Sequence, residues 1–559
     1  MNVILWAQTA AVILGIYYIV VYLERALRRR LLLKHTYVLD NDTLGRRLPS
    51  QKIKGAAVVC GGSIAGLIAA RACHDHFEEV VIVEPEARLS SQDAKRTDVW
   101  NQENKRTRIM QYDSIHSFLA AGYMSLTKLF LNLAEECKSL SVRIGPNDQQ
   151  AHMWGREVIS PFKQYGGSLP KTLYLGRRGL ETLLRHPVLS GDYKSIRQVI
   201  GTVIGISRDV SDPHFIDRVM IRTPEGAMTD IPAALIVDCT GPVAAGLKWL
   251  RREGYGVGNT YAKNELPLDR LKISYDQKLH YSTLLLHIPP ELGRKLPGFP
   301  GPYDECGMIY AFIPDTNEEN RCIYSQRIEG DYSSESASEL PKTLEEAKVW
   351  ARTLVTEVPI PEGWYAMLDM LKEVQDTMAC SQVRFGKVDA SLLSRGVNLP
   401  SNWIAAGDCV MRVNPIFGHG CSKAIGGAVC LNKLLQTVPV SIPKDFSKKY
   451  FQMHADKIEP ICLRTHAWHH NHEYDKNHWY RLLIPDYGFP TTVPVPGETL
   501  SEGAWLRWYI KKLTDLAFTD AQAASALWHI RVLLAPPTDL MQLSLVLKVV
   551  WNLIRCPCF

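Results

Sequence analysis

A short apolar run that ends in a glycine-rich turn constrains this chain more than any other feature. Residues 56–60 read as a buried parallel strand, residues 61–66 as the turn, and the alanine-rich stretch to about Cys73 as a helix. The next apolar run, residues 80–83, ends in Glu84, an acid about 20 residues after the glycines, as in dinucleotide sites. Strand, turn, helix, strand and acid in this order predict a βαβ unit that binds a dinucleotide.

Each part of this predicted unit has a physical task. Gly61 permits a tight turn, and Gly66 lets the helix approach the strand. The helix N-terminus presents unpaired N–H groups and a positive dipole to a pyrophosphate, and Glu84 can accept from a ribose hydroxyl. Ser63 stands where the usual motif has its middle glycine, but its small side chain beside Gly62 still leaves room for a phosphate.

A second glycine-rich segment lies far downstream. Residues 403–408 read as an apolar strand that ends in Gly-Asp, and residues 414–420 lead into another helix of small residues. Pro415 pre-sets the chain direction, Gly418 and Gly420 allow close backbone approach, and the helix directs its N-terminal dipole at an anion. The sequence therefore predicts a second anion-binding turn.

The two turns together favour a flavin over a nicotinamide cofactor. An NAD dehydrogenase needs no second site, whereas a reduced flavin carries negative charge at its pyrimidine edge, which a helix N-terminus stabilises. Asp408 is placed to bind the ribityl or ribose side of the same molecule. We therefore expect FAD as the cofactor.

At this point the chain resembles a family, the FAD-dependent monooxygenases of the hydroxybenzoate-hydroxylase and squalene-epoxidase type. The opening G-G-S-I-A-G-L at residues 61–67 and the G-D and N-P-x-x-G-x-G elements at residues 407–420 are similar to those of the family. Three further segments look like family motifs: Arg106 to Gln111 with His116, Arg177 to Glu181, and the strand end at residues 236–241. The likeness extends over roughly residues 54–440, and close relatives in appearance are fungal secondary-metabolite enzymes, including olefin epoxidases of meroterpenoid pathways and the oxidative-rearrangement enzyme of strobilurin-type polyketides.

The resemblance implies an α/β fold in which a doubly wound, glutathione-reductase-like Rossmann domain binds FAD and is interleaved with a mixed β-sheet substrate domain. We expect residues 50–440 to hold both, with the substrate sheet over residues 256–390 and pocket walls at residues 271–288 and 308–313. The cofactor-binding residues that the motifs and the resemblance together suggest are Gly61, Gly62, Ser63, Ile64, Ala65, Gly66, Glu84, Arg106, Gln111, Arg177, Asp238, Gly241, Asp408, Pro415, Gly418 and Gly420.

The reaction that the resemblance implies is transfer of one oxygen atom from O2 to a hydrophobic olefinic or aromatic metabolite, a polyketide or terpenoid. NADPH or NADH is the expected electron donor, but Pro242 follows Gly241 where many members have a Ser/Arg pattern, so a separate reductase stays open. The sequence identifies no catalytic acid or base, and the W-x-W-x-I-P signature of flavin halogenases is absent. Two alternatives stay open: a flavin-dependent reductase of prenyl double bonds, and a non-enzymatic escort protein of the dissociation-inhibitor fold.

The chain ends suggest membrane association. Residues 3–23 contain no charge and are followed by basic residues, which predicts a single-pass N-terminal anchor, within residues 1–34, and a catalytic domain facing the cytoplasm at the endoplasmic reticulum. A cleaved signal peptide is the rival interpretation. Residues 443–559 predict a helical region whose last helix, near residues 540–554, lies in the membrane interface or packs on the core.

Composition excludes other classes. A net charge of +6 over 559 residues is too small a basic excess for a nucleic-acid binder. The 13 cysteines show no C-x-x-C pair, which argues against a disulfide framework and a structural zinc site. A histidine cluster lacks the spacing of known metal motifs, so we expect no metal there; its members are His466, His469, His470, His472 and His478.

Overall fold

The fold is given by a computed structural model. It describes residues 2–86, 106, 109, 111–112, 114–148, 150–153, 155–258, 265–275, 280–297, 308–313, 323–328, 332–337, 341–354, 358–384, 388–413, 415, 418–459 and 504–555. The histidine cluster predicted to be free of metal lies outside these residues.

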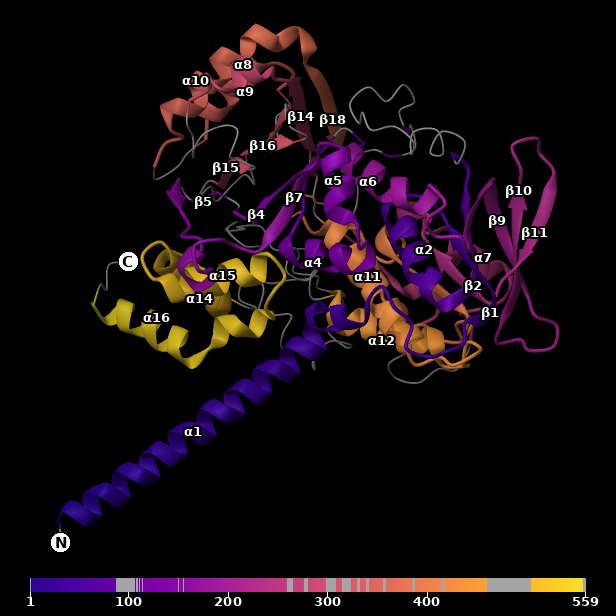
Figure 1. Ribbon diagram of the computed structural model, residues 1–559, viewed down its shortest axis with the longest axis horizontal. Coiled ribbons are helices and arrows are strands. Elements are labelled where there is room, and N and C mark those ends of the chain that lie inside the picture. The colour runs from indigo at the N-terminus through magenta and orange to yellow at the C-terminus, as the bar shows by residue number, and fades with distance from the viewer. Residues whose placement is uncertain are drawn as a thin grey trace.

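A five-stranded sheet carries the first glycine turn, and two of its strands, β1 (Ile53–Cys60) and β2 (Phe77–Glu84), are seen near helix α2 (Ile64–His76) in Figure 1. Its strands pair in parallel throughout and run in the order β20 (Trp403–Ala405), β12 (Leu235–Asp238), β1, β2 and β8 (Ile196–Ile200). Parallel sheets are covered on both faces, and the apolar side chains of β1 and β2 are accordingly buried. The α/β class and the strands expected near residues 56–60, 80–83, 236–238 and 403–405 are confirmed.

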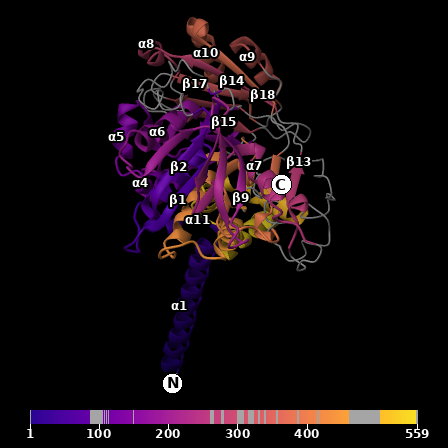
Figure 2. The same cartoon turned by 90° about the vertical axis from the view of Figure 1, so that its right-hand side faces the viewer.

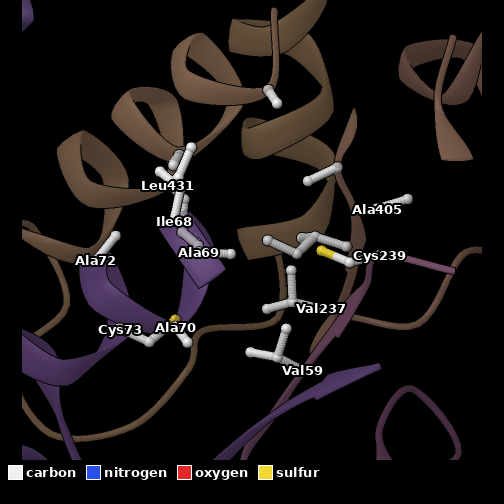
Figure 3. Packing of buried hydrophobic residues seen from close by; sticks show 14 of the residues in the cluster. Val59, Ile68, Ala69, Ala70, Ala72, Cys73, Val237, Cys239, Ala405 and Leu431 are labelled. Carbon is white, nitrogen blue, oxygen red and sulfur yellow. The ribbon is translucent and has the colours of Figure 1, made fainter. Parts of the chain in front are cut away.

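Helix α2 (Ile64–His76) follows β1 directly, and α11 (His419–Leu435) packs against it. Small residues let the two helices approach each other. Figure 3 shows Leu431 of α11 next to Ile68 of α2, with Val59 and Val237 of the sheet close by. The βαβ unit predicted from the glycine motif is therefore confirmed, and α11 is the second predicted small-residue helix.

A second, seven-stranded sheet is mostly antiparallel, with one parallel pair between β15 and β5. Its order is β18 (Ala379–Arg384), β14 (His280–His287), β17 (Tyr332–Ala337), β16 (Ile323–Ile328), β15 (Met308–Ile313), β5 (Ala151–Met153) and β6 (Arg156–Glu157). Helices α8 (Pro290–Gly293), α9 (Leu344–Arg352) and α10 (Glu362–Met370) lie at the same end of the molecule (Figure 1).

The two predicted pocket walls have different outcomes. Residues 308–313 form one strand, β15, as expected. Residues 271–288 instead divide into β14 and β13 (Lys272–Tyr275), which pairs with β19 (Val388–Ser391) in a separate small sheet. Leu284 and Leu286 of β14 pack in an apolar cluster with Trp364, so these two side chains are core rather than pocket.

The remaining described elements surround these two sheets. Two three-stranded sheets are formed by β3 (Ile115–Ser117), β7 (Lys171–Gly176) and β4 (Arg143–Pro146), and by β11 (Met228–Pro232), β10 (Ile216–Arg222) and β9 (Thr202–Arg208). The helices near the parallel sheet are α4 (Ala120–Leu129), α5 (Leu133–Ser139), α6 (Arg177–Leu189), α7 (Ala245–Arg252) and α12 (Phe446–Lys457).

The N-terminal helix α1 (Asn2–His35) is one continuous helix that projects from the body of the molecule (Figures 1 and 2). Its second half carries Glu24, Arg25, Arg28, Arg29 and Arg30, so the apolar stretch is not a separate element. Within the described part of the chain, no helix has the length and apolar character needed to span a bilayer. The predicted single-pass anchor and the localisation that rested on it are therefore wrong.

The C-terminal end of α1 is fixed to the body by a buried lysine. Lys457 of α12 donates to the carbonyl oxygen of Thr36 at 2.9 Å and to that of Leu33, and lies 2.8 Å from Asp40. These carbonyls belong to the last turn of α1 and the residue after it, where helices leave acceptors unpaired. A cation at this place also complements the helix dipole.

Replacing Lys457 should weaken this attachment. We expect Lys457→Met to lower the free energy of unfolding by about 2–3 kcal/mol, because Asp40 and the carbonyl oxygens lose their donor in a buried place. The matched control is Lys449→Met on the same helix, since Lys449 is 60% exposed and pairs only with Asp445 among the described residues. Denaturant unfolding of both variants measures the difference, and equal effects would contradict the assigned role of Lys457.

The C-terminal region contains the expected helices α14 (Ala504–Ala517), α15 (Ala521–Arg531) and α16 (Leu543–Arg555). They share an apolar cluster of their own, to which α16 contributes Leu545 and Val549. Trp528 of α15 anchors them to the body by donating from Nε1 to the carbonyl oxygen of Asn147 at 3.3 Å. One face of α16 thus packs on neighbouring helices, while Leu543, Leu547 and Trp551 are exposed, so its place in the membrane interface or on the core stays a prediction.

Candidate functional site

The first glycine turn is packed so closely that two positions accept only glycine. Gly61 has φ +117°, and a Cβ there would lie 2.5 Å from the carbonyl oxygen of Cys239. A Cβ on Gly66 would lie 1.8 Å from the carbonyl oxygen of Gly61. Both contacts are with backbone, which does not move aside, so the turn has the tight geometry predicted for these glycines.

The N-terminus of α2 has no side-chain cap among the described residues. The side chain of Ser63, the N-cap residue, makes no bond to the helix, and its Oγ accepts from Nη2 of Arg177 at 2.6 Å. Arg177 is the first residue of α6, and its bond to Ser63 places its guanidinium at the start of α2. Two positive features, the helix N-terminus and the arginine, meet at one place, which favours an anion there.

The second glycine segment meets the first. After β20 the chain enters the turn η7 (Gly407–Cys409), in which Gly407 has φ +70°. A Cβ on Gly407 would lie 2.7 Å from the Cβ of Ala65, in the first turn of α2. We call this place, where residues 61–66 meet Gly407–Cys409, the turn junction.

Helix α11 begins close to the turn junction. Its N-cap is Gly418, with φ +64°, whose N–H donates to the carbonyl oxygen of Pro415 at 3.0 Å, and no described side chain caps it. A Cβ on Gly420 would meet only Val413, at 4.0 Å, so packing does not require glycine at that position. A second uncapped helix N-terminus therefore follows the second turn, as its predicted role requires.

Asp408 carries negative charge at the turn junction. Burial raises its pKa, but Lys423, Arg177 and Arg412 outweigh burial and leave the pKa lowered. The Asp408 side chain keeps 47% of its surface accessible, so a ligand can reach it. Sequence reasoning missed Lys423, whose only signal was a cation among small residues near the start of the second predicted helix.

Glu84 lies at the end of β2, beside the first turn, but its carboxylate is already engaged. It accepts from the N–H of Gly62 at 2.7 Å and from that of Glu86 at 3.0 Å, and Nη2 of Arg106 lies 3.1 Å away. A carboxylate offers about four acceptor positions, so one remains for a ribose hydroxyl.

Arg106 is the centre of a buried charge network that sequence spacing did not reveal. Besides Glu84 it contacts Glu86, at 2.9 Å, and Glu181 of α6. Glu181 also pairs with Arg185 and, at 3.3 Å, with Arg177. The network therefore links Glu84, the last residue of β2, to Arg177, the first residue of α6.

Asp238 is held by the chain that follows it and by the neighbouring turn η7. Oδ1 accepts from the N–H and the hydroxyl of Thr240 at 3.0 and 2.7 Å and from Sγ of Cys409 at 3.3 Å. Oδ2 accepts from the N–H of Gly246 at 2.9 Å. The carboxylate is buried and shapes the turn, while Gly241 beside it has φ +71° and open space around a Cβ. The structure thus places Gly241, rather than the Asp238 carboxylate, next to free volume.

Gln111 connects the turn region to the seven-stranded sheet. Its Nε2 donates to the hydroxyl of Tyr281, on β14, at 2.7 Å, and Oγ of Ser114 lies 3.3 Å from the same hydroxyl. Burial raises the pKa of Tyr281, so its hydroxyl stays protonated at neutral pH. His116, whose pKa burial and Arg177 lower to about 4, is neutral there. These neutral polar groups suit positioning and present no nucleophile with an adjacent base.

No protein-family model matches the chain, and no curated protein matches it. Several solved structures are similar in shape. They include a triple mutant of the flavin-dependent brominase Bmp2 (12% identity, 85% of this chain and 98% of that chain, TM-score 0.49) and CmlS, a flavin-dependent halogenase (14%, 84% and 72%, TM-score 0.49). A third is the tetrameric form of 2-methyl-3-hydroxypyridine-5-carboxylic acid oxygenase (16%, 75% and 90%, TM-score 0.43). Identities and scores at this level do not decide the reaction of this chain.

Proposed function

We propose that this chain is an FAD-dependent monooxygenase that transfers one oxygen atom from O2 to a hydrophobic olefinic or aromatic metabolite. The observation that carries the proposal is the turn junction. Two glycine turns that are more than 300 residues apart in the sequence meet there, since a Cβ on Gly407 would lie 2.7 Å from that of Ala65. A single ligand with an anionic centre and two extended ends explains why both turns are needed in one place.

The residues at the turn junction fit FAD. The pyrophosphate is an anion, and the uncapped start of α2 with Arg177 beside it supplies N–H donors and positive charge. The sugar hydroxyls need acceptors, which Asp408 and the remaining position on Glu84 supply. The tight contacts at Gly61 and Gly66 bring the backbone as near to the phosphates as the fold allows. The start of α11 would face the flavin ring.

Bound FAD, once reduced, supplies the activation of O2. The chain's own residues bind and orient the two reactants and keep water from them, which is the main requirement for oxygen transfer to an alkene or arene. Gln111 donates to Tyr281 of the seven-stranded sheet. We expect the substrate to bind near this pair. We infer no catalytic acid or base. The electron donor is NADPH or NADH, used directly or through a separate reductase.

Labelled oxygen tests the proposal. Purified protein supplied with FAD, NADPH or a reductase, and a panel of lipophilic olefins and phenols should incorporate label from O2 into one product, with substrate-stimulated NADPH oxidation. Label from water instead would contradict the monooxygenase assignment. Turnover that continues without O2 would indicate a double-bond reductase, and a protein that stays colourless with added FAD would indicate an escort role.

A further inference from the structure

A lysine is buried directly behind the acid of the turn junction. Lys423 lies in the second turn of α11 and is 1% exposed. Its Nζ lies 2.5 Å from Oδ1 of Asp408 and donates to the carbonyl oxygen of Met411 at the same distance. A buried ammonium group is costly unless it is paired and hydrogen-bonded, so a position of this kind calls for a reason.

The pair is asymmetric, and the asymmetry indicates its purpose. Lys423 is closed off, whereas the Asp408 side chain is 47% exposed toward the turn junction. Oδ1 is held by the lysine, and no described residue donates to Oδ2. The lysine thus fixes one oxygen of the carboxylate, while the side chain as a whole stays partly accessible to a ligand.

The electrostatic surroundings maintain this state. Burial raises the pKa of Asp408, and the cations that outweigh it are Lys423 first, then Arg177 and Arg412. Two further titratable groups interact with Asp408. Burial and Arg177 lower the pKa of His116, from β3, to about 4, and burial raises the pKa of Cys421, from α11, to about 11, so neither adds charge at neutral pH. Asp408 is therefore ionised over the neutral range, and Lys423 is the nearest cause.

We propose that Lys423 is a positioning residue for FAD, which holds Asp408 so that its Oδ2 accepts a hydrogen bond from a sugar-chain hydroxyl of the cofactor. This inference rests on the proposed FAD site. It differs from a purely structural role, in which Lys423 merely satisfies the Met411 carbonyl and a buried acid. A structural role predicts lower stability when Lys423 is replaced but no change in how FAD binding depends on pH.

The test is the dissociation constant of FAD for the apoprotein, measured by quenching of FAD fluorescence from about pH 8 to about pH 5. In the parent protein the constant should stay flat, because Asp408 stays ionised throughout. In Lys423→Met the desolvation of Asp408 is no longer offset by its nearest cation, so its pKa rises. FAD binding should then weaken at least tenfold at the acid end, with a slope toward one decade per pH unit.

Two further variants keep the test sharp. Lys423→Gln retains a hydrogen-bond donor without the charge and should show the same pH slope if Lys423→Met fails to fold. Lys433→Met, on the same helix and 43% exposed, is the matched control and should bind FAD within about twofold of the parent at every pH. In Lys423→Met combined with Asp408→Asn, binding should be weak and independent of pH.

The outcomes separate this inference from the proposed function. If the parent protein binds no FAD, the proposed function fails first. The role of Lys423 is overturned, while the FAD site stands, if the dissociation constant of FAD for the parent protein already rises as the pH falls from about 8 to about 6. The same holds if the dissociation constants for Lys423→Met and Lys423→Gln do not change with pH.

Discussion

Gly66→Ala should give a protein that retains no FAD and is less stable by about 3 kcal/mol or more. The new Cβ would lie 1.8 Å from the carbonyl oxygen of Gly61 and 2.9 Å from its carbonyl carbon. Both atoms are backbone atoms of the turn itself, so α2 must move away from β1 or the turn must open. Either change separates the N–H groups of α2 from Asp408, and the proposed FAD site is lost. FAD content after reconstitution and the denaturant midpoint measure the two effects.

The control for this substitution is Gly363→Ala in α10. A Cβ at Gly363 would have no neighbour within 4 Å, and the position is helical. Alanine there should leave FAD binding unchanged and alter stability by no more than about 1 kcal/mol, in the favourable direction. A Gly66→Ala protein as yellow and as stable as this control would show that the first turn is not as tight as the structure has it.

Arg106→Met should cost about 3–5 kcal/mol of stability at neutral pH, because it leaves buried carboxylates without their shared cation. Arg106 is 4% exposed and contacts Glu84, Glu86 and Glu181. Glu181 keeps Arg177 and Arg185, so the loss falls mainly on Glu84 and Glu86. Because Glu84 also accepts from Gly62 in the first turn, FAD binding should weaken together with stability.

The pH dependence of this loss has a definite sign. Burial raises the pKa of Glu181, but Arg185, Arg177 and Arg106 outweigh it and leave the pKa lowered. A carboxylate of lowered pKa contributes stability that is present above its unfolded pKa, near 4.3, and is lost as the pH falls through its folded pKa. Because Arg106 is one of the three cations that lower this pKa, the part of the deficit in Arg106→Met that Glu181 carries should be constant at neutral pH and should shrink as the pH falls below about 4.3.

Unfolding by denaturant at several pH values measures that difference. Arg218→Met is the matched control, since Arg218 is 45% exposed and pairs with Asp217 and Asp230 at the surface, where ion pairs contribute little. A deficit in Arg106→Met that is the same at acid and neutral pH would mean that the side chain acts through packing rather than charge.

The parts of the fold that the sequence predicted best are those governed by local rules. A strand, a glycine turn and a small-residue helix each leave a pattern within a few neighbouring residues, and β1, α2, β2, β20 and α11 all lie where those patterns placed them. The turn around Gly66 also has the close contact that its glycine implied.

What sequence reasoning missed depends on contacts between distant segments. Arg106 meets Glu181 only through the fold, and Lys423 looked like an ordinary surface cation in a helix. The sequence predicts a single pocket wall at residues 271–288, but strand pairing divides these residues between two sheets. The membrane span at residues 3–23 was inferred from an uncharged apolar stretch and the basic residues after it, and that inference was wrong.

The most direct test of the account is the amount of FAD bound per chain after reconstitution and removal of free cofactor. The account predicts one FAD per chain for the parent protein, and loss of that FAD on changing either turn, with Gly66→Ala in the first and Asp408→Ala in the second. The claim that the two turns form one cofactor site would be contradicted if both variants retained as much FAD as the parent protein. It would also be contradicted if the parent protein bound none.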